Sequence, residues 1–220
     1  MGMPVILYGK SGSGKSRSLK NFKEDEILLV NVERKALPFR GKFKYVCMSD
    51  NVTTIVDQLN KMPLKTAVID DAGYIMTNKF MRGHSSGRKG REVYDLYNDI
   101  GDSFWILIES IKKLPEDVIV YIIMHEEYND AGELKLKTIG RLLDNNVCIE
   151  GMVTVCIRCA NIDGKHVFQL HSADGCDITK TPEEMFDADE MDNDLKAVDT
   201  AIREYYGFDP IKAAAKDTGA

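Results

Sequence analysis

The chain has 220 residues, of which 44% are hydrophobic and 29% charged, so it suits one soluble domain with a single substantial core. It shows no apolar run of the twenty or so residues that cross a bilayer and no secretion signal at its start, so we expect a cytoplasmic protein without a membrane partner. A net charge of −6 excludes a protein that coats nucleic acid with its whole surface, and any such contact must be local.

Strand and helix patterns alternate along the first two thirds of the chain. Short runs rich in Val, Ile and Leu predict buried strands, and apolar residues at helical spacing predict the helices between them. This alternation is typical of an α/β fold with a mostly parallel sheet that helices cover on both sides. The predicted strands are 4–9, 26–33, 43–48, 65–71 and 117–125, and the predicted helices are 15–22, 52–62 and 93–114, the last either continuous or broken at Gly101.

The last third has a different character. Residues 152–171 predict a β-hairpin that turns at Asp163 and Gly164, and a polar segment then leads into a helix that ends at Gly207. We expect a nucleotide-binding core over residues 1–175. Residues 176–220 would form an acidic segment and a helix, packed on the core or on a neighbouring subunit.

Cysteine and histidine spacing raises the question of a metal. The series Cys156, Cys159, His166 and His171 has residue types that suit zinc. Alternation along the predicted strand, however, sends Cys156 and Cys159 to opposite faces, which favours buried reduced thiols over a zinc site.

A glycine-rich motif follows the first strand. The segment GKSGSGKS matches the phosphate-binding pattern G-x-x-x-x-G-K-[ST] at every fixed position. Glycines let backbone N–H groups turn toward phosphate oxygens, Lys15 reaches the β and γ oxygens, and the Ser16 hydroxyl suits Mg²⁺. The motif predicts a nucleoside triphosphate site. The expected nucleotide-binding residues are Gly9, Lys10, Ser11, Gly12, Ser13, Gly14, Lys15, Ser16 and Arg17.

Acidic and polar residues end three neighbouring strands. Asp70 closes the strand 65–71 and is the expected second Mg²⁺ ligand, while Asp71 is either a catalytic neighbour or, preferably, a helix N-cap. Glu33 is the candidate base that polarises the attacking water, with a solvated glutamate as the alternative. His125 is the candidate sensor of the γ-phosphate, with a satisfied core histidine as the alternative.

Two predicted loops follow strands of this same edge. The first, residues 81–92, contains Arg82, Arg88, Lys89 and Arg91 and carries no acid between the first and last of these. In an otherwise acidic chain this favours contact with the phosphate backbone of DNA over a merely solvated loop. The second predicted loop, residues 126–138, and the segment after it contain Lys135, Lys137 and Arg141.

The motifs together resemble the RecA-like P-loop ATPases and, more narrowly, the phage nucleotide-binding proteins of the Sak single-strand annealing group. The resemblance rests on GKSGSGKS, LLVNVERKAL, TAVIDDAG and IVYIIMHEE and covers roughly residues 3–172. It implies a RecA-like core, ATP with Mg²⁺, and a ring or filament of identical subunits. It also implies that the two loops hold single-stranded DNA. Cations of one subunit complete the ATP site of the next in that family, and Lys135, Lys137 and Arg141 match them.

The sequence thus predicts an ATPase coupled to single-stranded DNA binding and self-assembly in phage-type recombination or replication, acting in the host cytoplasm if phage-encoded. A small-molecule P-loop kinase shares the opening motif and the size, and residues 81–92 could serve as its lid. A binding module that ATP switches without turnover is the third alternative.

Overall fold

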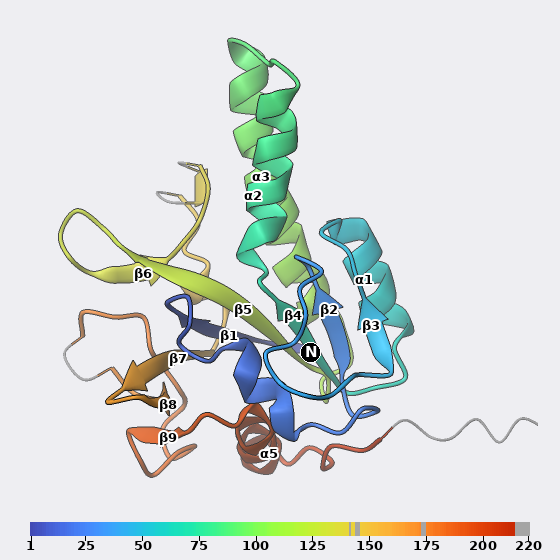
Figure 1. The fold of residues 1–220 in the computed structure, drawn as a ribbon, viewed down its shortest axis with the longest axis vertical. Coiled ribbons are helices and arrows are strands. Elements are labelled where there is room, and N and C mark those ends of the chain that lie inside the picture. Colours follow the sequence, from blue (N-terminus) through green and yellow to red (C-terminus); the bar gives the residue numbers. More distant parts are fainter. Residues whose placement is uncertain (141, 144–145, 173–174, 214–220) are drawn as a thin grey trace, which may run out of the picture.

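The computed structural model describes residues 1–140, 142–143, 146–172 and 175–213. Within them, nine strands form one sheet and the helices lie on both of its faces (Figure 1). The strands are β1 (Met3–Gly9), β2 (Leu28–Asn31), β3 (Tyr45–Cys47), β4 (Thr66–Asp70), β5 (Ile119–Tyr128), β6 (Leu134–Leu136), β7 (Val155–Ile162), β8 (Lys165–Gln169) and β9 (Glu190–Asp192). The α-helices are α1 (Val52–Lys61), α2 (Gly73–Ser85), α3 (Arg91–Lys112) and α5 (Leu195–Tyr206), and the 3-10 helices are η1 (Ser16–Asn21) and η2 (Glu150–Met152).

The strand order brings the carboxyl ends of β1, β4 and β5 together. The order is β3-β2-β4-β5-β1-β7-β8-β9, with β6 paired to β5 beyond this path. The strands from β3 to β7 in this order run parallel, whereas β8, β9 and β6 pair antiparallel. Because β5 lies between β1 and β4, the residues at the carboxyl ends of these three strands lie side by side at one edge of the sheet.

Two apolar layers hold the sheet. Alternate residues of the central strands point to opposite faces, as in Ile6 and Leu7 of β1, which belong to different clusters. Helices α1, α2 and α3 cover one face, and η1 and α5 cover the other. The predicted fold class is confirmed: a mostly parallel α/β sheet flanked by helices, with a C-terminal β-hairpin and helix. No helix of the described residues is both long enough and apolar enough to span a membrane.

The predicted loop 81–92 is wrong. Helix α2 runs to Ser85 and α3 begins at Arg91, so only residues 86–90 connect them. The two helices pack as an antiparallel pair that projects beyond the rest of the molecule (Figure 1). Local Gly and Ser content suggested a loop, but the packing of Leu96 against Gly83 stabilises the helical hairpin.

Helix α3 is continuous through Gly101. A Cβ at this glycine would lie 2.7 Å from the Leu142 side chain, so the glycine makes room for a packed neighbour instead of breaking the helix. This settles the two alternatives that the pattern left open.

The predicted loop 126–138 is also wrong. Strand β5 continues to Tyr128 and returns as β6, with Glu127 opposite Lys135. The alternating Leu134 and Leu136 are buried, which gives this short return strand an apolar side to pack. Residues 126–136 are therefore a β-hairpin at the edge where the central strands end.

The C-terminal third follows its predicted pattern. Strands β7 and β8 turn at Asp163 and Gly164, both with positive φ, as a two-residue hairpin requires. Cys156 and Cys159 belong to the apolar clusters on opposite faces of the sheet, and the described residues hold no group of three metal-binding side chains. The cysteines are buried thiols, and burial raises the pKa of Cys156 to about 12.

Helix α5 lies against the amino ends of β4 and β5. The Asp194 side chain accepts hydrogen bonds from the backbone of the first turn, and Gly207 ends the helix in the left-handed conformation, as predicted. Asp199 and Arg203 point inward, where Arg203 Nε donates to Asp199 Oδ1 at 2.6 Å. The helix thus packs on this chain's own sheet.

Candidate nucleotide-binding site

The phosphate-binding loop turns tightly at the end of β1. A Cβ at Gly9 would lie 2.2 Å from the Cys159 carbonyl oxygen, and one at Gly14 would lie 2.8 Å from the ring of His166. Glycine is therefore required at both positions by close neighbours as well as by backbone conformation. The Ser13 carbonyl accepts hydrogen bonds from His166 Nδ1 at 2.7 Å and from Cys159 Sγ at 3.1 Å. Strands β7 and β8 thus hold the loop in place.

A cavity of about 640 Å³ opens beside this loop. It lies at the carboxyl ends of the parallel strands, where ligands bind in open α/β sheets. Residues from the phosphate loop, the segment after β2, the end of β4, the start of α2, the β5–β6 hairpin and β8 line it. They are Lys10, Ser11, Gly12, Gly14, Lys15, Ser16, Arg17, Lys35, Ala36, Leu37, Pro38, Asp70, Asp71, Tyr74, His125, Glu126, Lys137 and His166.

Lys15 is folded back onto its own loop. Its ammonium donates to the carbonyl oxygens of Gly9 at 2.8 Å and Lys10 at 2.7 Å, and it lies 3.4 Å from His125 Nδ1. Burial lowers the pKa of Lys15, while nearby anionic groups oppose that shift. Lys15 is 6% exposed, so the charged group is held at the cavity wall by neutral partners, two carbonyl oxygens and an imidazole nitrogen.

Ser16 and Asp70 meet at the start of η1. The Ser16 hydroxyl donates to Asp70 Oδ1 at 2.9 Å. Burial and the neighbouring charge of Asp71 raise the pKa of Asp70 to about 6. A carboxylate with too little positive charge around it, next to a hydroxyl oxygen, is a donor set that suits Mg²⁺.

Asp71 is not the predicted helix cap. Ala72 occupies the N-cap position of α2, and the Asp71 side chain turns into the cavity instead. Lys35 Nζ lies 2.6 Å from Asp71 Oδ2, and His125 Nε2 lies 3.4 Å from Oδ1. Burial alone would raise the pKa of Asp71, but the hydrogen bonds from His125 and Lys35 outweigh it and lower the pKa to about 2.

His125 lies between Lys15 of the phosphate loop and Asp71 at the end of β4. Its Nδ1 faces Lys15, which can only donate, so Nδ1 is the acceptor and Nε2 carries the proton toward Asp71. Tyr74 lies edge-on to the His125 ring, with centroids 6.1 Å apart, and under the Lys35 ammonium at 4.9 Å. The end of β5 is thus coupled by direct contacts to the phosphate loop and to the end of β4.

The structure brings most of the predicted nucleotide residues together but separates others. Glu33 does not line the cavity; its carboxylate accepts a hydrogen bond from Asn78 at 2.8 Å. Lys137 lines the cavity of its own chain, whereas Lys135 lies 3.1 Å from Glu127 on the hairpin. Arg141 lies outside the described residues.

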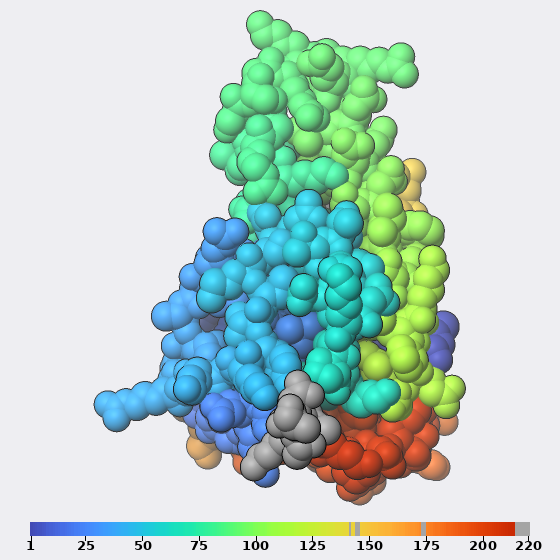
Figure 2. Space-filling model, turned by 90° about the vertical axis from the view of Figure 1, so that its right-hand side faces the viewer, coloured from blue at the N-terminus to red at the C-terminus, as the bar shows by residue number. Residues whose placement is uncertain are grey.

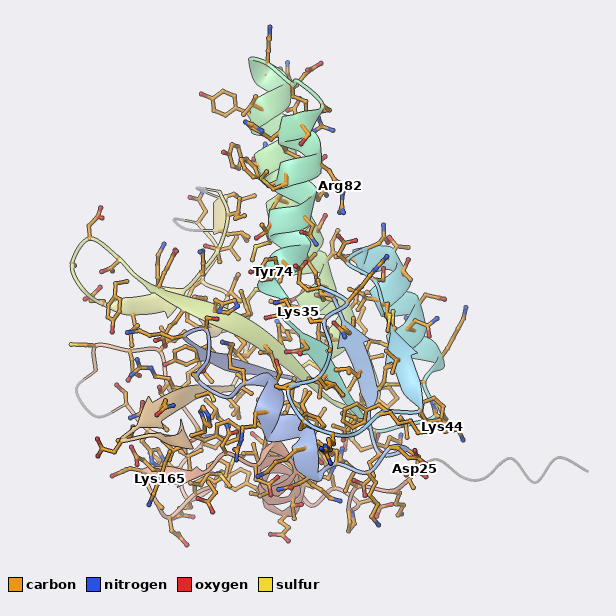
Figure 3. The ribbon with its side chains drawn as sticks, in the orientation of Figure 1. Asp25, Lys35, Lys44, Tyr74, Arg82 and Lys165 are labelled. Carbon is orange, nitrogen blue, oxygen red and sulfur yellow. The ribbon has the colours of Figure 1, made fainter. Side chains whose placement is uncertain are left out.

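The predicted DNA-binding cations lie on the helical hairpin, away from this cavity. Arg88 and Lys89 are exposed in the connection between α2 and α3, and Arg91 is exposed at the start of α3. Arg82 lies partway along α2 (Figure 3) and pairs with Asp50 at 2.7 Å. The hairpin therefore presents three cations at its far end and one closer to the sheet.

Lys35, Tyr74 and His166 are among the cavity residues that were not predicted. Lys35 follows the second strand by only a few residues, and its charge was the available signal. His166 contacts the phosphate loop only because β8 lies beside β7, and β7 beside β1. No local pattern reveals such a contact across 153 positions.

A triphosphate with Mg²⁺ fits the residues present. Gly9 and Gly14 leave no room for a Cβ beside β7 and β8, and the Ser13 hydroxyl is buried without a hydrogen-bond partner among the described residues. Four lysines of the lining and the loop N–H groups supply positive charge, and Ser16 with Asp70 supplies oxygen ligands. The arrangement can bind phosphate oxygens and a divalent cation.

Known proteins resemble the chain in sequence family and in fold. The family described as an AAA domain matches residues 1–179. Among curated proteins, none matches the chain in sequence. A solved structure of a prototypical ATPase from the type III secretion system of pathogenic bacteria has 14% sequence identity and a TM-score of 0.43, over 73% of this chain. The chain covers 52% of that ATPase, about half of its length.

Proposed function

The chain belongs to the AAA domain family, and from this premise we propose that it is a Mg²⁺-dependent ATPase whose turnover is coupled to single-stranded DNA and to self-assembly. The observation that carries the proposal is the meeting of Ser16 and Asp70 at 2.9 Å, at one side of a cavity lined by the phosphate loop. The resemblance to phage single-strand annealing proteins supports recombination or replication as the setting. ATP and Mg²⁺ are the proposed ligands.

The phosphate loop and its neighbours have separate roles in this proposal. Loop N–H groups and Lys15 bind the β and γ oxygens, so Lys15 must leave the carbonyls of Gly9 and Lys10 when the nucleotide enters. Ser16 and Asp70 would hold Mg²⁺, which neutralises charge on the phosphate oxygens when bound. Lys137 lines the same cavity and adds a cation from within the chain.

Two carboxylates compete for the role of the group that polarises water. Glu33 is the candidate from the sequence, and Asn78 holds its carboxylate outside the cavity lining. Asp71 is favoured by position, because it lines the cavity between Lys35 and His125. Loss of the γ-phosphate would be sensed through His125, which contacts both Lys15 and Asp71.

The first experiment measures phosphate release with and without single-stranded DNA, beside a screen of nucleoside acceptors. DNA-stimulated release supports the proposed function. Transfer of phosphate to an acceptor identifies a kinase instead, and tight ATP binding without either product identifies a binding module. Lys15→Ala should abolish tight ATP binding, by roughly a hundredfold or more, because the phosphate charge loses its main side-chain partner.

A pair of isosteric variants separates the two candidate bases. The residue that polarises water should lose turnover when changed to its amide, with ATP affinity retained. We therefore compare Glu33→Gln with Asp71→Asn in single-turnover assays. If neither amide reduces turnover while ATP binding persists, both assignments are wrong.

DNA binding is proposed for the far end of the helical hairpin. Changing Arg88, Lys89 and Arg91 together to Ala should weaken binding of a single-stranded oligonucleotide. The slope of the logarithm of the binding constant against the logarithm of salt concentration should become less steep by about 2. The matched control removes three exposed lysines elsewhere, Lys61, Lys113 and Lys165. An unchanged salt slope in the hairpin variant would contradict the assignment.

Self-assembly into a ring or filament is proposed from the family resemblance. Lys135 and Arg141 remain the candidates for completing a neighbour's ATP site, whereas Lys137 is better placed for its own. Light scattering with a non-hydrolysable ATP analogue and an oligonucleotide tests assembly directly. A protein that stays monomeric under all these conditions argues against it.

A further inference from the structure

The segment between β2 and β3 is the most basic stretch of the chain that no predicted role includes. Residues 34–44, here called the basic segment, contain no Asp or Glu in a chain of net charge −6. All of its cations are exposed. They are Arg34, Lys35, Arg40, Lys42 and Lys44.

Apolar residues hold the basic segment in place. Leu37 and Phe39 pack against the core on the η1 and α5 face, and Phe43 is buried there. The rings of Phe39 and Phe43 meet edge to face at 6.4 Å. Since Phe43 points inward between two exposed lysines, the backbone directs the charged side chains to the surface. The cations are presented by a packed support.

The charges of the basic segment have few internal partners. Among the described residues, no carboxylate pairs with Arg34, Arg40 or Lys42, whereas Lys61 on α1 pairs with Asp57. Lys35 is the most compensated, because its ammonium lies 2.6 Å from Asp71 Oδ2. At the other end of the segment the Lys44 backbone N–H donates to the Glu24 carbonyl, which brings the segment close to Asp25 (Figure 3). The segment keeps a net positive surface after this compensation.

The basic segment joins the nucleotide cavity to the outer edge of the sheet. Residues 35–38 line the cavity, and Lys44 precedes the edge strand β3. Figure 3 shows the two ends well apart, with Lys35 near Tyr74 and Lys44 beyond it. In Figure 2 the blue and light-blue atoms of this region form a continuous outer surface with a projecting arm. Next to it Tyr45 lies under the Lys44 ammonium, with 5.2 Å from Nζ to the ring centroid.

We propose that the basic segment binds the phosphate backbone of a single-stranded nucleic acid, at a surface separate from the helical hairpin. Exposed cations spaced along one surface segment fit the phosphates of a flexible polyanion, and the half-buried Tyr45 adds a ring at the end of the segment. The segment is not an amphipathic helix with an apolar side to insert, so a membrane surface fits it less well. The inference deepens the proposed function, because it adds a nucleic-acid contact at the rim of the ATP cavity.

The contact also explains how nucleic acid could affect the ATP site. Lys35 belongs to the basic segment and lies 2.6 Å from Asp71 in the cavity. A phosphate group that attracts Lys35 outward would weaken its hold on Asp71. By linkage, ATP and nucleic acid would then change each other's affinity by the same factor.

The test removes charge from the part of the segment outside the cavity. The variant Arg40→Ala, Lys42→Ala, Lys44→Ala is compared with wild type and with the control Lys61→Ala, Lys113→Ala, Lys165→Ala, which removes equal charge elsewhere. Binding of fluorescent single-stranded DNA and single-stranded RNA is measured by anisotropy across a salt series. Binding of a fluorescent ATP analogue is measured in parallel.

We expect the basic-segment variant to bind the oligonucleotide roughly tenfold more weakly. The slope of the logarithm of the binding constant against the logarithm of salt concentration should become less steep by about 2, since each lost phosphate contact contributes about 0.7. ATP binding should be unchanged, and the control should lose much less. The DNA and RNA arms identify which nucleic acid is preferred.

Three outcomes would overturn the inference. Equal losses in the variant and the control would show a general charge effect. Oligonucleotide binding unchanged in the variant would exclude the surface, as would a wild type that binds only anionic vesicles or an acidic peptide. Failure of the proposed function is a separate result: a wild type without phosphate release whose oligonucleotide binding still depends on this segment keeps the inference and rejects the ATPase.

Discussion

Carboxylates are buried at both ends of the central strands, but their surroundings differ. At the amino ends, Asp199 is fully buried and accepts hydrogen bonds from Arg203 at 2.6 Å, Thr66 at 3.1 Å and Tyr121 at 3.2 Å. At the carboxyl ends, Asp70 and Asp71 are adjacent like charges beside an open cavity. The first group is complete without a ligand. In the second, Asp71 is paired with Lys35, whereas Asp70 accepts from the Ser16 hydroxyl beside the cavity and could bind a cation there.

This difference separates a structural charge from a binding charge. Arg203 is 2% exposed and also donates to the backbone carbonyls of Lys65 at 2.9 Å and Asp117 at 3.1 Å, so it joins α5 to the starts of two strands. Nothing comparable surrounds Asp70, whose pKa is raised to about 6 by burial and by Asp71. Burial raises the pKa of Asp199 as well, so the difference lies in the partners. Asp70 accepts from the Ser16 hydroxyl beside an open cavity, which indicates a cation site.

The largest effect is expected from breaking the buried pair of Asp199 and Arg203 at the amino ends of the strands. Arg203→Met leaves the Asp199 carboxylate buried without its partner, which should cost about 3–5 kcal/mol of unfolding free energy. Urea denaturation measures it, with the exposed Arg40→Met as the control. The double variant Asp199→Leu, Arg203→Met should lose less than the single one, because no charge is left unpaired. A single-variant loss below about 1 kcal/mol would contradict the comparison.

A change of opposite sign is expected at the open end. Asp70→Asn removes a carboxyl whose ionisation the fold disfavours, so it should stabilise the ligand-free protein. The folded pKa of about 6 lies above the ordinary 3.8, so the stability that this group provides is full below pH 3.8 and is lost as pH rises through about 6. The difference between these two pKa values corresponds to at most about 3 kcal/mol of unfolding free energy.

The Tm difference between Asp70→Asn and wild type should therefore grow from pH 4 to pH 6 and stay constant above. The exposed Asp57→Asn on α1 is the matched control and should show no such growth. Mg²⁺-dependent ATP binding should fall in the Asp70 variant although the protein is more stable. A lower Tm at pH 7.5 with an equal Tm at pH 4.5 would contradict the assigned direction of the shift.

The sequence predicted the residues at the carboxyl ends of the strands far better than the Asp199–Arg203 pair at the amino ends. Gly9 to Ser16 and Asp70 occupy strand ends, and parallel strands bring their carboxyl ends to one edge, so a local motif sufficed. Asp199 and Arg203 are four residues apart on a helix, which looks like an ordinary exposed pair. Their burial depends on where α5 docks, and that is set by packing distant in sequence.

The same reasoning explains the wrong predictions. Composition favoured loops at 81–92 and 126–138, but Leu96 packing on Gly83 extends α2, and the buried Leu134 and Leu136 return the chain as β6. Tertiary contacts override local propensity in both segments. Asp71 was predicted as a helix cap because its position before α2 is a local signal. Its contact with Lys35 depends on the pairing of β2 with β4, which the sequence does not show.

The smallest effect is expected from Lys35→Gln, which alters the ion pair between Lys35 and Asp71 at the rim of the cavity. Lys35 is 54% exposed, so its contact with Asp71 is screened and should contribute less than about 1 kcal/mol. The pKa of Asp71 is lowered to about 2, so the stability from this carboxylate is present above pH 3.8 and is lost as pH falls through about 2. The small Tm loss should thus be constant from pH 5 to pH 8. Lys44→Gln serves as the control, and a loss as large as that of Arg203→Met would mean that the two ends of the sheet hold their charges in the same way.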